Sequence, residues 1–192
     1  MAQRVLVDAN VIASRTLTDW LYQLRTYNSG MYTMLWTRDI QAETIRVMRR
    51  RHPTLAGTTI ERRLKMLEDV IDEMVVYPDM DYGFTGADSG DFHVHAAAVA
   101  GRANYLLTNN RPEDFTAAPA EEHYEIYNSD DFFNLVADSN VQAFMAATEA
   151  QFMFYSRPGV TSRPIHKTLE SAGCPLFAQR VKSALAEIAQ RR

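Results

Sequence analysis

The fold is decided near the start of the chain, by the stretch Arg4-Val5-Leu6-Val7-Asp8-Ala9-Asn10-Val11-Ile12. Its run of apolar, β-forming residues is typical of a strand that is buried on both faces in the middle of a parallel sheet. The run ends on Asp8. Because ligands of open α/β sheets bind beyond the carboxyl ends of the strands, this carboxylate lies where chemistry is expected. The alternative is that Asp8 only caps the helix that follows it.

Helix and strand patterns alternate after this stretch. Apolar residues at helical spacing predict helices over residues 14–28, 37–51, 58–71 and 91–102. Short β-forming runs predict further strands over residues 31–36, 74–77, 104–108 and 123–127. Such alternation is typical of an α/β domain with a mainly parallel sheet, here of five strands.

The C-terminal part of the chain has a different character. Its pattern predicts only helices, over residues 129–136, 139–154, 161–172 and 175–188. We therefore expect an α/β domain over residues 1–136 and a helical C-terminal extension over residues 137–192. The extension is too small and too poor in polar chemistry for a second catalytic domain.

Composition narrows the class of protein. The chain has 192 residues, of which 46% are hydrophobic, enough for a folded core. It contains no apolar run of the roughly 18 residues that a membrane span needs and no signal-peptide pattern. Cys174 is the single cysteine, which excludes an intramolecular disulfide and a thiolate metal site. We expect a reduced, cytoplasmic setting and no membrane partner.

The net charge of −4 argues against a protein that holds nucleic acid by a uniformly basic surface. Local charge still matters for an enzyme, and positive residues gather around Arg46, Arg49 and Arg50. This cluster is either a solvated helix face or a patch that steers an RNA substrate.

Glu43 is predicted to lie on the inward face of the helix over residues 37–51. Ile40 lies three residues before it and Val47 four residues after it, so the three side chains project from one face. Because burying an unpaired charge is costly, such a carboxylate needs a partner or a metal ion. A salt bridge to an arginine is the structural alternative.

Two further groups of polar residues are expected near Asp8. Asp88 and Asp91 lie at the start of the helix over residues 91–102, where Asp91 points inward and Asp88 either joins the site or caps the helix. Thr108 and Asn110 follow the strand over residues 104–108, at the sheet edge where Asp8 also lies; turn formation is the structural alternative for the asparagine.

Carboxylates that are drawn together repel one another unless cations neutralise them. Oxygen ligands suit Mg²⁺ or Mn²⁺ and not zinc. Such ions activate water and stabilise the charge that builds on a phosphodiester. The order of the acidic residues along the chain therefore indicates metal-assisted phosphodiester hydrolysis.

The same segments resemble the PIN-domain family of nucleases, and in particular the VapC-type toxins of bacterial toxin–antitoxin modules. Residues 5–11 are similar to the first motif of that family, and Glu43 occupies the place of its helix-borne glutamate. Residues 91–98 resemble its third motif, which begins with an aspartate and is rich in alanine, and residues 103–110 resemble its fourth. The resemblance covers roughly residues 4–135, and residues 172–177 resemble the C-terminal extension of one branch.

The resemblance implies a three-layer α/β/α sandwich and an Mg²⁺- or Mn²⁺-dependent endoribonuclease. It also implies a cognate antitoxin that blocks the active site, and a homodimer. Carried over to this chain, the catalytic and metal-binding acids are Asp8, Glu43 and Asp91. The accessory residues are Asp88, Asn10, Thr108 and Asn110. Many members carry an aspartate where Asn110 stands, so the site has one negative charge fewer and the occupancy of a second metal position is open.

Three alternatives differ from a toxin nuclease. A haloacid-dehalogenase-like phosphatase also has an aspartate after its first strand, but it needs a second one where this chain has Asn10. A non-catalytic PIN module that binds RNA or a protein partner has no reason to keep buried acids. A housekeeping PIN nuclease that processes RNA differs from a toxin only in context, and the small size and the C-terminal resemblance favour the toxin.

Overall fold

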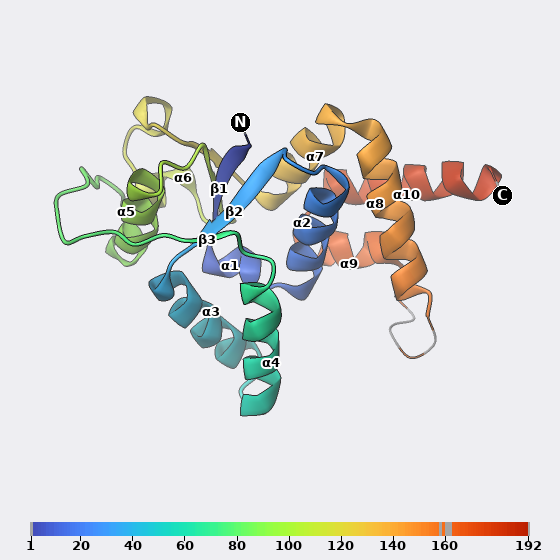
Figure 1. Cartoon of the computed structure of the whole chain (residues 1–192), viewed down its shortest axis with the longest axis horizontal. Helices are drawn as coiled ribbons and strands as arrows, with labels where there is room; N and C mark the ends of the chain where they lie inside the picture. Colours follow the sequence, from blue (N-terminus) through green and yellow to red (C-terminus); the bar gives the residue numbers. More distant parts are fainter. Residues whose placement is uncertain (1, 158, 160–162, 192) are drawn as a thin grey trace. The chain divides into compact units, whose positions relative to one another are not determined.

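The computed structural model describes residues 2–157, 159 and 163–191 (Figure 1). They divide into two compact units. The first contains the residues up to 13 and residues 31–128, and the second contains residues 14–30 together with the described residues from 129 onward. The helix predicted over residues 14–28 thus groups with the C-terminal helices. The predicted boundary after residue 136 stays a prediction.

The first unit is built on a parallel sheet with the strand order β3-β2-β1-β4-β5. Its strands are β1 (Gln3–Val7), β2 (Tyr32–Trp36), β3 (Glu73–Met74), β4 (Tyr105–Leu107) and β5 (Glu125–Tyr127). The central strand β1 pairs with β2 on one side and with β4 on the other. Val5, Leu6 and Val7 have no exposed surface, as expected for a strand covered on both faces.

Helices flank this sheet. They are α1 (Ala9–Ile12), α3 (Arg38–Arg51), α4 (Gly57–Glu68), α5 (Phe92–Ala100) and α6 (Pro112–Phe115), with 3-10 turns η1 (Ser89–Asp91) and η2 (Pro119–Glu121). The hydroxyl of Thr37 accepts a hydrogen bond from the backbone N–H of Ile40 at 3.1 Å, which caps α3. The short helix α1 was not expected from the sequence, because four residues are too few to show helical periodicity.

Strand β3 is shorter than the predicted strand over residues 74–77. It pairs with β2 only at Leu35 and Trp36. After Trp36 the chain of β2 turns away from the sheet, because Thr37 caps the helix α3 that begins there. Residues after Val75 therefore have no ladder partner in β2, and the strand ends.

The second unit consists of helices. They are α2 (Arg15–Tyr27), α7 (Ser129–Ser139), α8 (Val141–Tyr155), α9 (Ile165–Ser171) and α10 (Pro175–Gln190). Phe177 is the centre of their core, with ring centroids 5.0 Å from Trp20, 5.2 Å from Phe133 and 5.7 Å from Phe144. The predicted helix over residues 161–172 corresponds to α9, and residues 161 and 162 lie outside the described residues.

A buried carboxylate holds α10 in this unit. Asp130 accepts hydrogen bonds from the backbone N–H groups of Leu176 and Phe177, at 3.0 and 2.7 Å. These N–H groups belong to the first turn of α10, which has no partners within the helix. Cys174 is buried just before this turn, and burial raises the pKa of its thiol to about 12.

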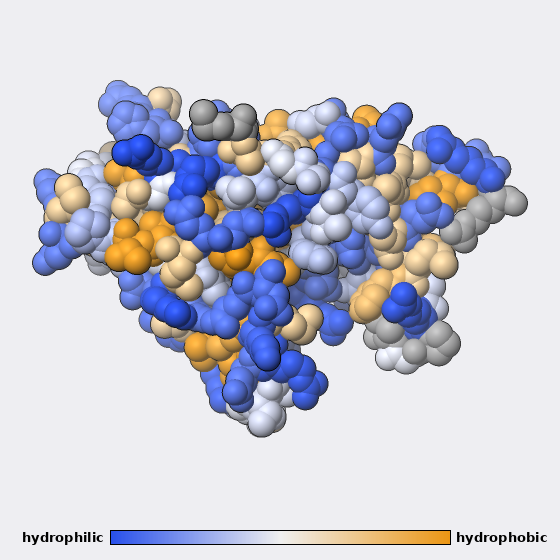
Figure 2. Space-filling view, in the orientation of Figure 1, coloured by the Kyte–Doolittle hydropathy of each residue, from blue (hydrophilic) through white to orange (hydrophobic). Residues whose placement is uncertain are grey.

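The expected fold class is confirmed: the α/β sandwich rests on a five-stranded parallel sheet flanked by helices, and helices follow at the C-terminal end. Figure 2 shows apolar residues that reach the surface in separate places between hydrophilic ones. Among the described helices, none combines the length and the apolarity that a membrane span requires.

Candidate active site

Asp8 and Thr108 meet where β1 and β4 end. Asp8 stands at the N-cap position of α1, but its side chain is directed at neighbouring polar groups instead of capping that helix. Its Oδ2 accepts a hydrogen bond from the hydroxyl of Thr108 at 2.7 Å and one from the amide of Asn10 at 2.7 Å. Asp8 is only 3% exposed and Thr108 is fully buried. Parallel pairing of the two strands thus brings together residues that are far apart in the sequence.

The amide of Asn10 connects both strand ends. Its Nδ2 donates to Asp8, to the hydroxyl of Thr108 at 3.1 Å and to Oδ1 of Asn110 at 3.0 Å. Its Oδ1 accepts from the backbone N–H of Asn109 at 3.1 Å. Asn10 therefore fixes the loop after β4 relative to the end of β1.

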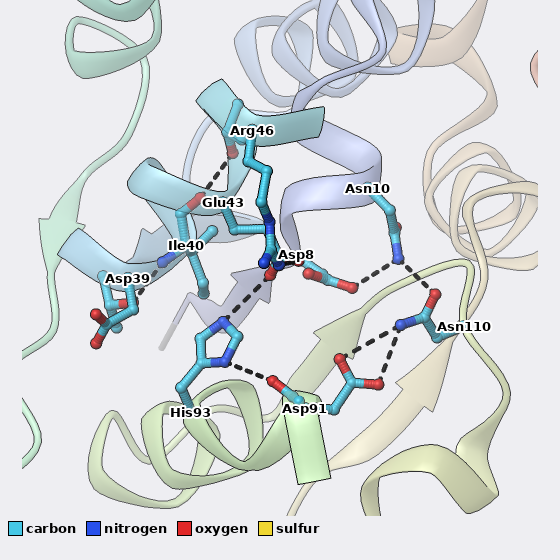
Figure 3. Close-up of polar contacts among 12 residues, drawn as sticks. Asp8, Asn10, Asp39, Ile40, Glu43, Arg46, Asp91, His93 and Asn110 are labelled. Atoms are coloured by element: carbon cyan, nitrogen blue, oxygen red, sulfur yellow. Dashed lines mark hydrogen bonds and ion pairs between the residues drawn. The ribbon is translucent and has the colours of Figure 1, made fainter. Parts of the chain in front are cut away.

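Asn110 carries this connection on to Asp91. Its Nδ2 donates to the two carboxylate oxygens of Asp91, at 3.1 and 3.4 Å (Figure 3). Asp91 lies at the end of η1, directly before α5, and is 8% exposed. The amides of Asn10 and Asn110 thus form a bridge between the two buried carboxylates, Asp8 and Asp91.

Glu43 reaches the site from α3 and lies between two cationic or ionisable groups. Its Oε1 accepts from the guanidinium of Arg46 at 2.7 Å, and its Oε2 lies 3.3 Å from Nε2 of His93. The His93 pair has the distance of an ion contact but not the alignment of a hydrogen bond, whereas Nδ1 of His93 makes a 2.9 Å hydrogen bond with the carbonyl of Gly90. Figure 3 shows His93 between Glu43 and the start of α5.

Two other acidic residues serve helix ends. Oδ1 of Asp88 accepts from the backbone N–H of Gly90 at 2.8 Å and caps η1. Asp114 accepts from the backbone N–H of Arg111 at 3.1 Å and from its guanidinium at 2.9 Å, which completes a capping box in α6. Asp88 thus makes the helix-capping contact that was the alternative to a role in the site. Asp114 is engaged by Arg111, so it does not supply the negative charge that many PIN domains carry where this chain has Asn110.

The electrostatics of the site disfavour several ionised acids at once. Burial, together with the negative charges of Asp8, Asp88 and Glu43, raises the pKa of Asp91 to about 6, although the hydrogen bond from Asn110 acts in the opposite direction. Burial also raises the pKa of Asp8, and Glu43 adds to this effect. The hydroxyl of Thr108 and the backbone N–H of Ala9 act in the opposite direction. These carboxylates are close enough for each charge to oppose the others.

A divalent cation fits the chemistry of these side chains. Asp8, Asp91 and Glu43 offer carboxylate oxygens, and Asn110 offers an amide oxygen, the ligands that Mg²⁺ and Mn²⁺ prefer. A cation would also relieve the repulsion that raises the pKa of Asp91. In the described part of the chain, however, no three His, Cys, Asp or Glu side chains are grouped closely enough to hold a metal ion. Instead, the bridging amides and Arg46 satisfy the acids through hydrogen bonds.

The predicted basic cluster divides between two environments. Arg46 is exposed and forms the ion pair with Glu43, so it lies at the site. Arg49 and Arg50 are exposed in the last turn of α3, and Arg49 donates to the carbonyl of Leu55. Positive charge near the C-terminal end of a helix is favourable for the helix itself.

Sequence reasoning underrated Asn10 and did not foresee the contact of His93 with Glu43. Asn10 lies two residues after Asp8, at the start of α1, and a polar residue at that distance from a strand-end acid is the signal that could have indicated its role. His93 lies two residues after Asp91, and its contact with Glu43 joins α5 to α3. Spacing does not predict the contact of His93 with Glu43 or those of Asn10 with Thr108 and Asn110, because they join segments that are far apart in the sequence.

Comparison with known proteins identifies one family. A family model described as a PIN domain matches residues 4–112, which is more than half of the chain. The matched segment contains Asp8, Asn10, Glu43, Asp91 and Asn110. Comparison with curated proteins and comparison with solved structures gave no match.

Proposed function

The chain belongs to the PIN domain family, and we propose that it is an endoribonuclease that hydrolyses RNA phosphodiester bonds with the help of Mg²⁺ or Mn²⁺. Membership of this family indicates a nuclease, since PIN domains are generally nucleases. The choice of RNA as the substrate and of these ions as the cofactor is our proposal.

One observation carries the proposal. Asp8 and Asp91 are buried carboxylates at the carboxyl edge of the sheet, and each has a raised pKa. Holding acids together against their own repulsion reduces stability, and such an arrangement is expected where it serves a function. Perturbed pKa values indeed gather at functional sites. A non-catalytic module would have no need to bury them.

Each residue of the site has a task in this proposal. Asp8, Asp91 and Glu43 would hold the cation, and when bound it supplies the Lewis acidity that activates water and neutralises charge on the phosphate. The amides of Asn10 and Asn110 keep Asp8 and Asp91 at a fixed separation. His93 and Arg46 hold the carboxylate of Glu43 in place from opposite sides. Arg46, Arg49 and Arg50 would attract the RNA backbone.

The proposal is tested by RNA cleavage and by metal binding in parallel. The purified protein should cleave single-stranded RNA with Mg²⁺ or Mn²⁺ and not in EDTA. Asp91→Asn should reduce the cleavage rate by at least about 100-fold, because removing a group that stabilises transition-state charge has this order of effect. Calorimetric titration with Mn²⁺ should show binding to the wild type and much weaker binding to Asp91→Asn.

Asp79→Asn is the matched control, since Asp79 is an exposed aspartate of the preceding loop. This variant should cleave RNA and bind Mn²⁺ like the wild type. Cleavage that persists in EDTA, or full activity of Asp91→Asn, would contradict the proposed mechanism.

We further propose that this nuclease is the toxin of a type II toxin–antitoxin module. It would act in the cytoplasm as a homodimer. The resemblance of the C-terminal segment around Cys174 to the extension of one branch of these toxins supports this role. An antitoxin that inserts an arginine or lysine beside Asp8 and Asp91 would suit an acid-lined site. Expression of the wild type should arrest bacterial growth, whereas Asp91→Asn should not. Unimpaired growth with active enzyme present would favour a housekeeping RNA-processing nuclease.

A further inference from the structure

His93 extends from the start of α5 towards Glu43 on α3. Its Nε2 lies 3.3 Å from Oε2 of Glu43, and Figure 3 shows the ring and the carboxylate turned towards each other. This nitrogen is buried, and it has no hydrogen-bond partner within the described part of the chain. A buried polar atom without such a partner is rare in folded proteins, and the binding of an ion is one of the usual reasons for it.

The other ring nitrogen of His93 is held by the backbone. Nδ1 makes a 2.9 Å hydrogen bond with the carbonyl of Gly90. A carbonyl oxygen only accepts, so Nδ1 carries the hydrogen, and the neutral ring then has its lone pair on Nε2. The N–H of Gly90 in turn donates to Oδ1 of Asp88 at 2.8 Å, which fixes this turn. Histidines that bind metal ions have the same arrangement, in which the second nitrogen donates to a carbonyl or a carboxylate.

The contact of His93 with Glu43 is unfavourable without a cation, because the lone pairs of Nε2 and Oε2 repel each other. A proton on Nε2 would remove this repulsion, but the two groups lack the alignment of a hydrogen bond. Neighbouring ligands of an octahedral ion with bonds of about 2.1 Å lie roughly 3 Å apart. The separation of Nε2 and Oε2 therefore suits two ligands of one ion.

Glu43 has one carboxylate oxygen for each of its neighbours. Oε1 accepts from Arg46 at 2.7 Å, whereas Oε2 faces His93. A cation that binds Oε2 and Nε2 therefore leaves the ion pair with Arg46 intact. Asp8 lies within electrostatic reach of the same place: burial raises its pKa, Glu43 raises it further, and His93 acts in the opposite direction. His93 thus lies beside the acids that would hold the metal ion in the proposed function.

His95, two residues further along α5, differs from His93. Its Nδ1 makes a 2.7 Å hydrogen bond with the hydroxyl of Tyr124, and its Nε2 makes a 2.9 Å hydrogen bond with the carbonyl of Tyr82. Both nitrogens of His95 are therefore engaged inside the first unit. Of these two histidines, His93 is the one with a nitrogen that a metal ion can bind.

We propose that Nε2 of His93 is a nitrogen ligand of the metal ion that Asp8, Asp91 and Glu43 would hold, and that it makes the site prefer Mn²⁺ to Mg²⁺. The inference rests on the proposed metal-dependent function. Imidazole nitrogen is a ligand of transition-metal ions, to which Mn²⁺ belongs, whereas Mg²⁺ binds oxygen ligands. Because carboxylates alone accept either ion, the histidine decides the preference.

Calorimetric titration and pulsed electron paramagnetic resonance of the full chain, without RNA, test this ligand. The wild type loaded with Mn²⁺ should show the spin-echo modulation of a directly bound nitrogen nucleus. His93→Asn keeps an amide that can donate to the carbonyl of Gly90, but it lacks the metal-binding nitrogen. This variant should lose the modulation and bind Mn²⁺ at least about 10-fold more weakly, with a much smaller change in its affinity for Mg²⁺.

His123→Asn is the matched control, since His123 is exposed in the segment before β5, at the opposite edge of the sheet from Asp8. It should keep the wild-type modulation and the wild-type affinities for both ions. Absence of nitrogen modulation in the wild type, or equal fold losses for Mn²⁺ and Mg²⁺ in His93→Asn, would overturn the ligand. A lower kcat of His93→Asn with unchanged affinity for Mn²⁺ would also overturn it and assign the ring to proton transfer.

The two proposals fail in different ways. A wild type that shows the nitrogen modulation but never cleaves RNA would overturn the nuclease and leave the ligand in place. A wild type that cleaves RNA with Mn²⁺ and shows no nitrogen modulation would overturn the ligand alone.

Discussion

The side-chain amide of Asn110 donates to both carboxylate oxygens of Asp91, at 3.1 and 3.4 Å. The same amide accepts from Asn10, which itself donates to Asp8. A neutral amide thus contacts Asp91 at a place where another negative charge would be unfavourable. Asn110 is therefore a structural component of the metal-free site and not merely a missing acid.

Asn110→Asp should destabilise the metal-free protein. The new carboxylate would repel the carboxylate of Asp91, and the loss of a partly buried hydrogen bond to a charged group costs about 1–3 kcal/mol. Thermal unfolding in EDTA should show a lower Tm than the wild type, and Mn²⁺ should raise the Tm of Asn110→Asp more than that of the wild type. Asn110→Ala, which removes the amide without adding charge, should respond to Mn²⁺ like the wild type. Equal Tm values for Asn110→Asp and the wild type in EDTA would contradict this role.

Asp91→Asn should stabilise the metal-free protein at alkaline pH. The folded state raises the pKa of Asp91 from 3.8 to about 6, so it binds this proton more tightly than the unfolded chain does. The stability that this proton contributes is fully present below a pH of 3.8 and is lost as the pH rises through about 6. In EDTA at about pH 8 the variant should melt about 2–4 °C above the wild type, and the gain should shrink towards about pH 4.

Asp79→Asn provides the comparison for this pH series. Asp79 is exposed in the loop before α5, so its replacement should change the Tm little at either pH. A Tm gain for Asp91→Asn that does not vary between the two pH values would mean that the ionised carboxylate is not the cause.

Asp130→Ala should weaken the second unit. The carboxylate accepts from the backbone N–H groups of Leu176 and Phe177, and both would lose their partner, that of Phe177 in a buried place. The free energy of unfolding should fall by about 2 kcal/mol, as measured by urea denaturation. Asp131→Ala removes the neighbouring exposed carboxylate from the same helix turn and should cost less than about 0.5 kcal/mol. A similar decrease in the free energy of unfolding for both variants would show that negative charge at the start of α7 matters, and not the contact of Asp130 with α10.

Gly86→Ala should displace the loop that leads to Asp88 and Phe92. A Cβ there would lie 2.2 Å from the carbonyl oxygen of Asp114 and 2.7 Å from the carbonyl carbon of Phe115, and backbone atoms cannot rotate away. We expect a loss of about 1–3 kcal/mol in the free energy of unfolding. Gly57→Ala is the comparison, because its Cβ would meet only the end of the Arg49 side chain at 3.9 Å. Wild-type stability of Gly86→Ala would contradict the tight packing described here.

The sequence was sufficient for the parallel sheet, because Val5, Leu6 and Val7 form a run that only a doubly covered strand explains. It also placed Asp8 and Thr108 at one edge, since neighbouring parallel strands end together. It could not predict the amide bridge, because the hydrogen bonds of Asn10 depend on side-chain directions that are set after the strands pair.

The division into units was equally beyond the sequence. The helix over residues 14–28 was predicted with nearly correct ends, but periodicity does not say against which elements a helix packs. Trp20 on this helix contacts Phe177, more than a hundred residues later, and this contact places α2 with the C-terminal helices. Only the three-dimensional packing of aromatic rings reveals that grouping.

The central position of β1 has a consequence for when the protein can act. The strand is made first but is complete only when β4 has paired with it, so Asp8 has neither Thr108 nor the amide of Asn110 nearby until then. Contacts of such large sequence separation form slowly, because a long loop must close first. During synthesis, the hydrogen-bonded arrangement around Asp8 therefore cannot form until the residues after β4 have left the ribosome.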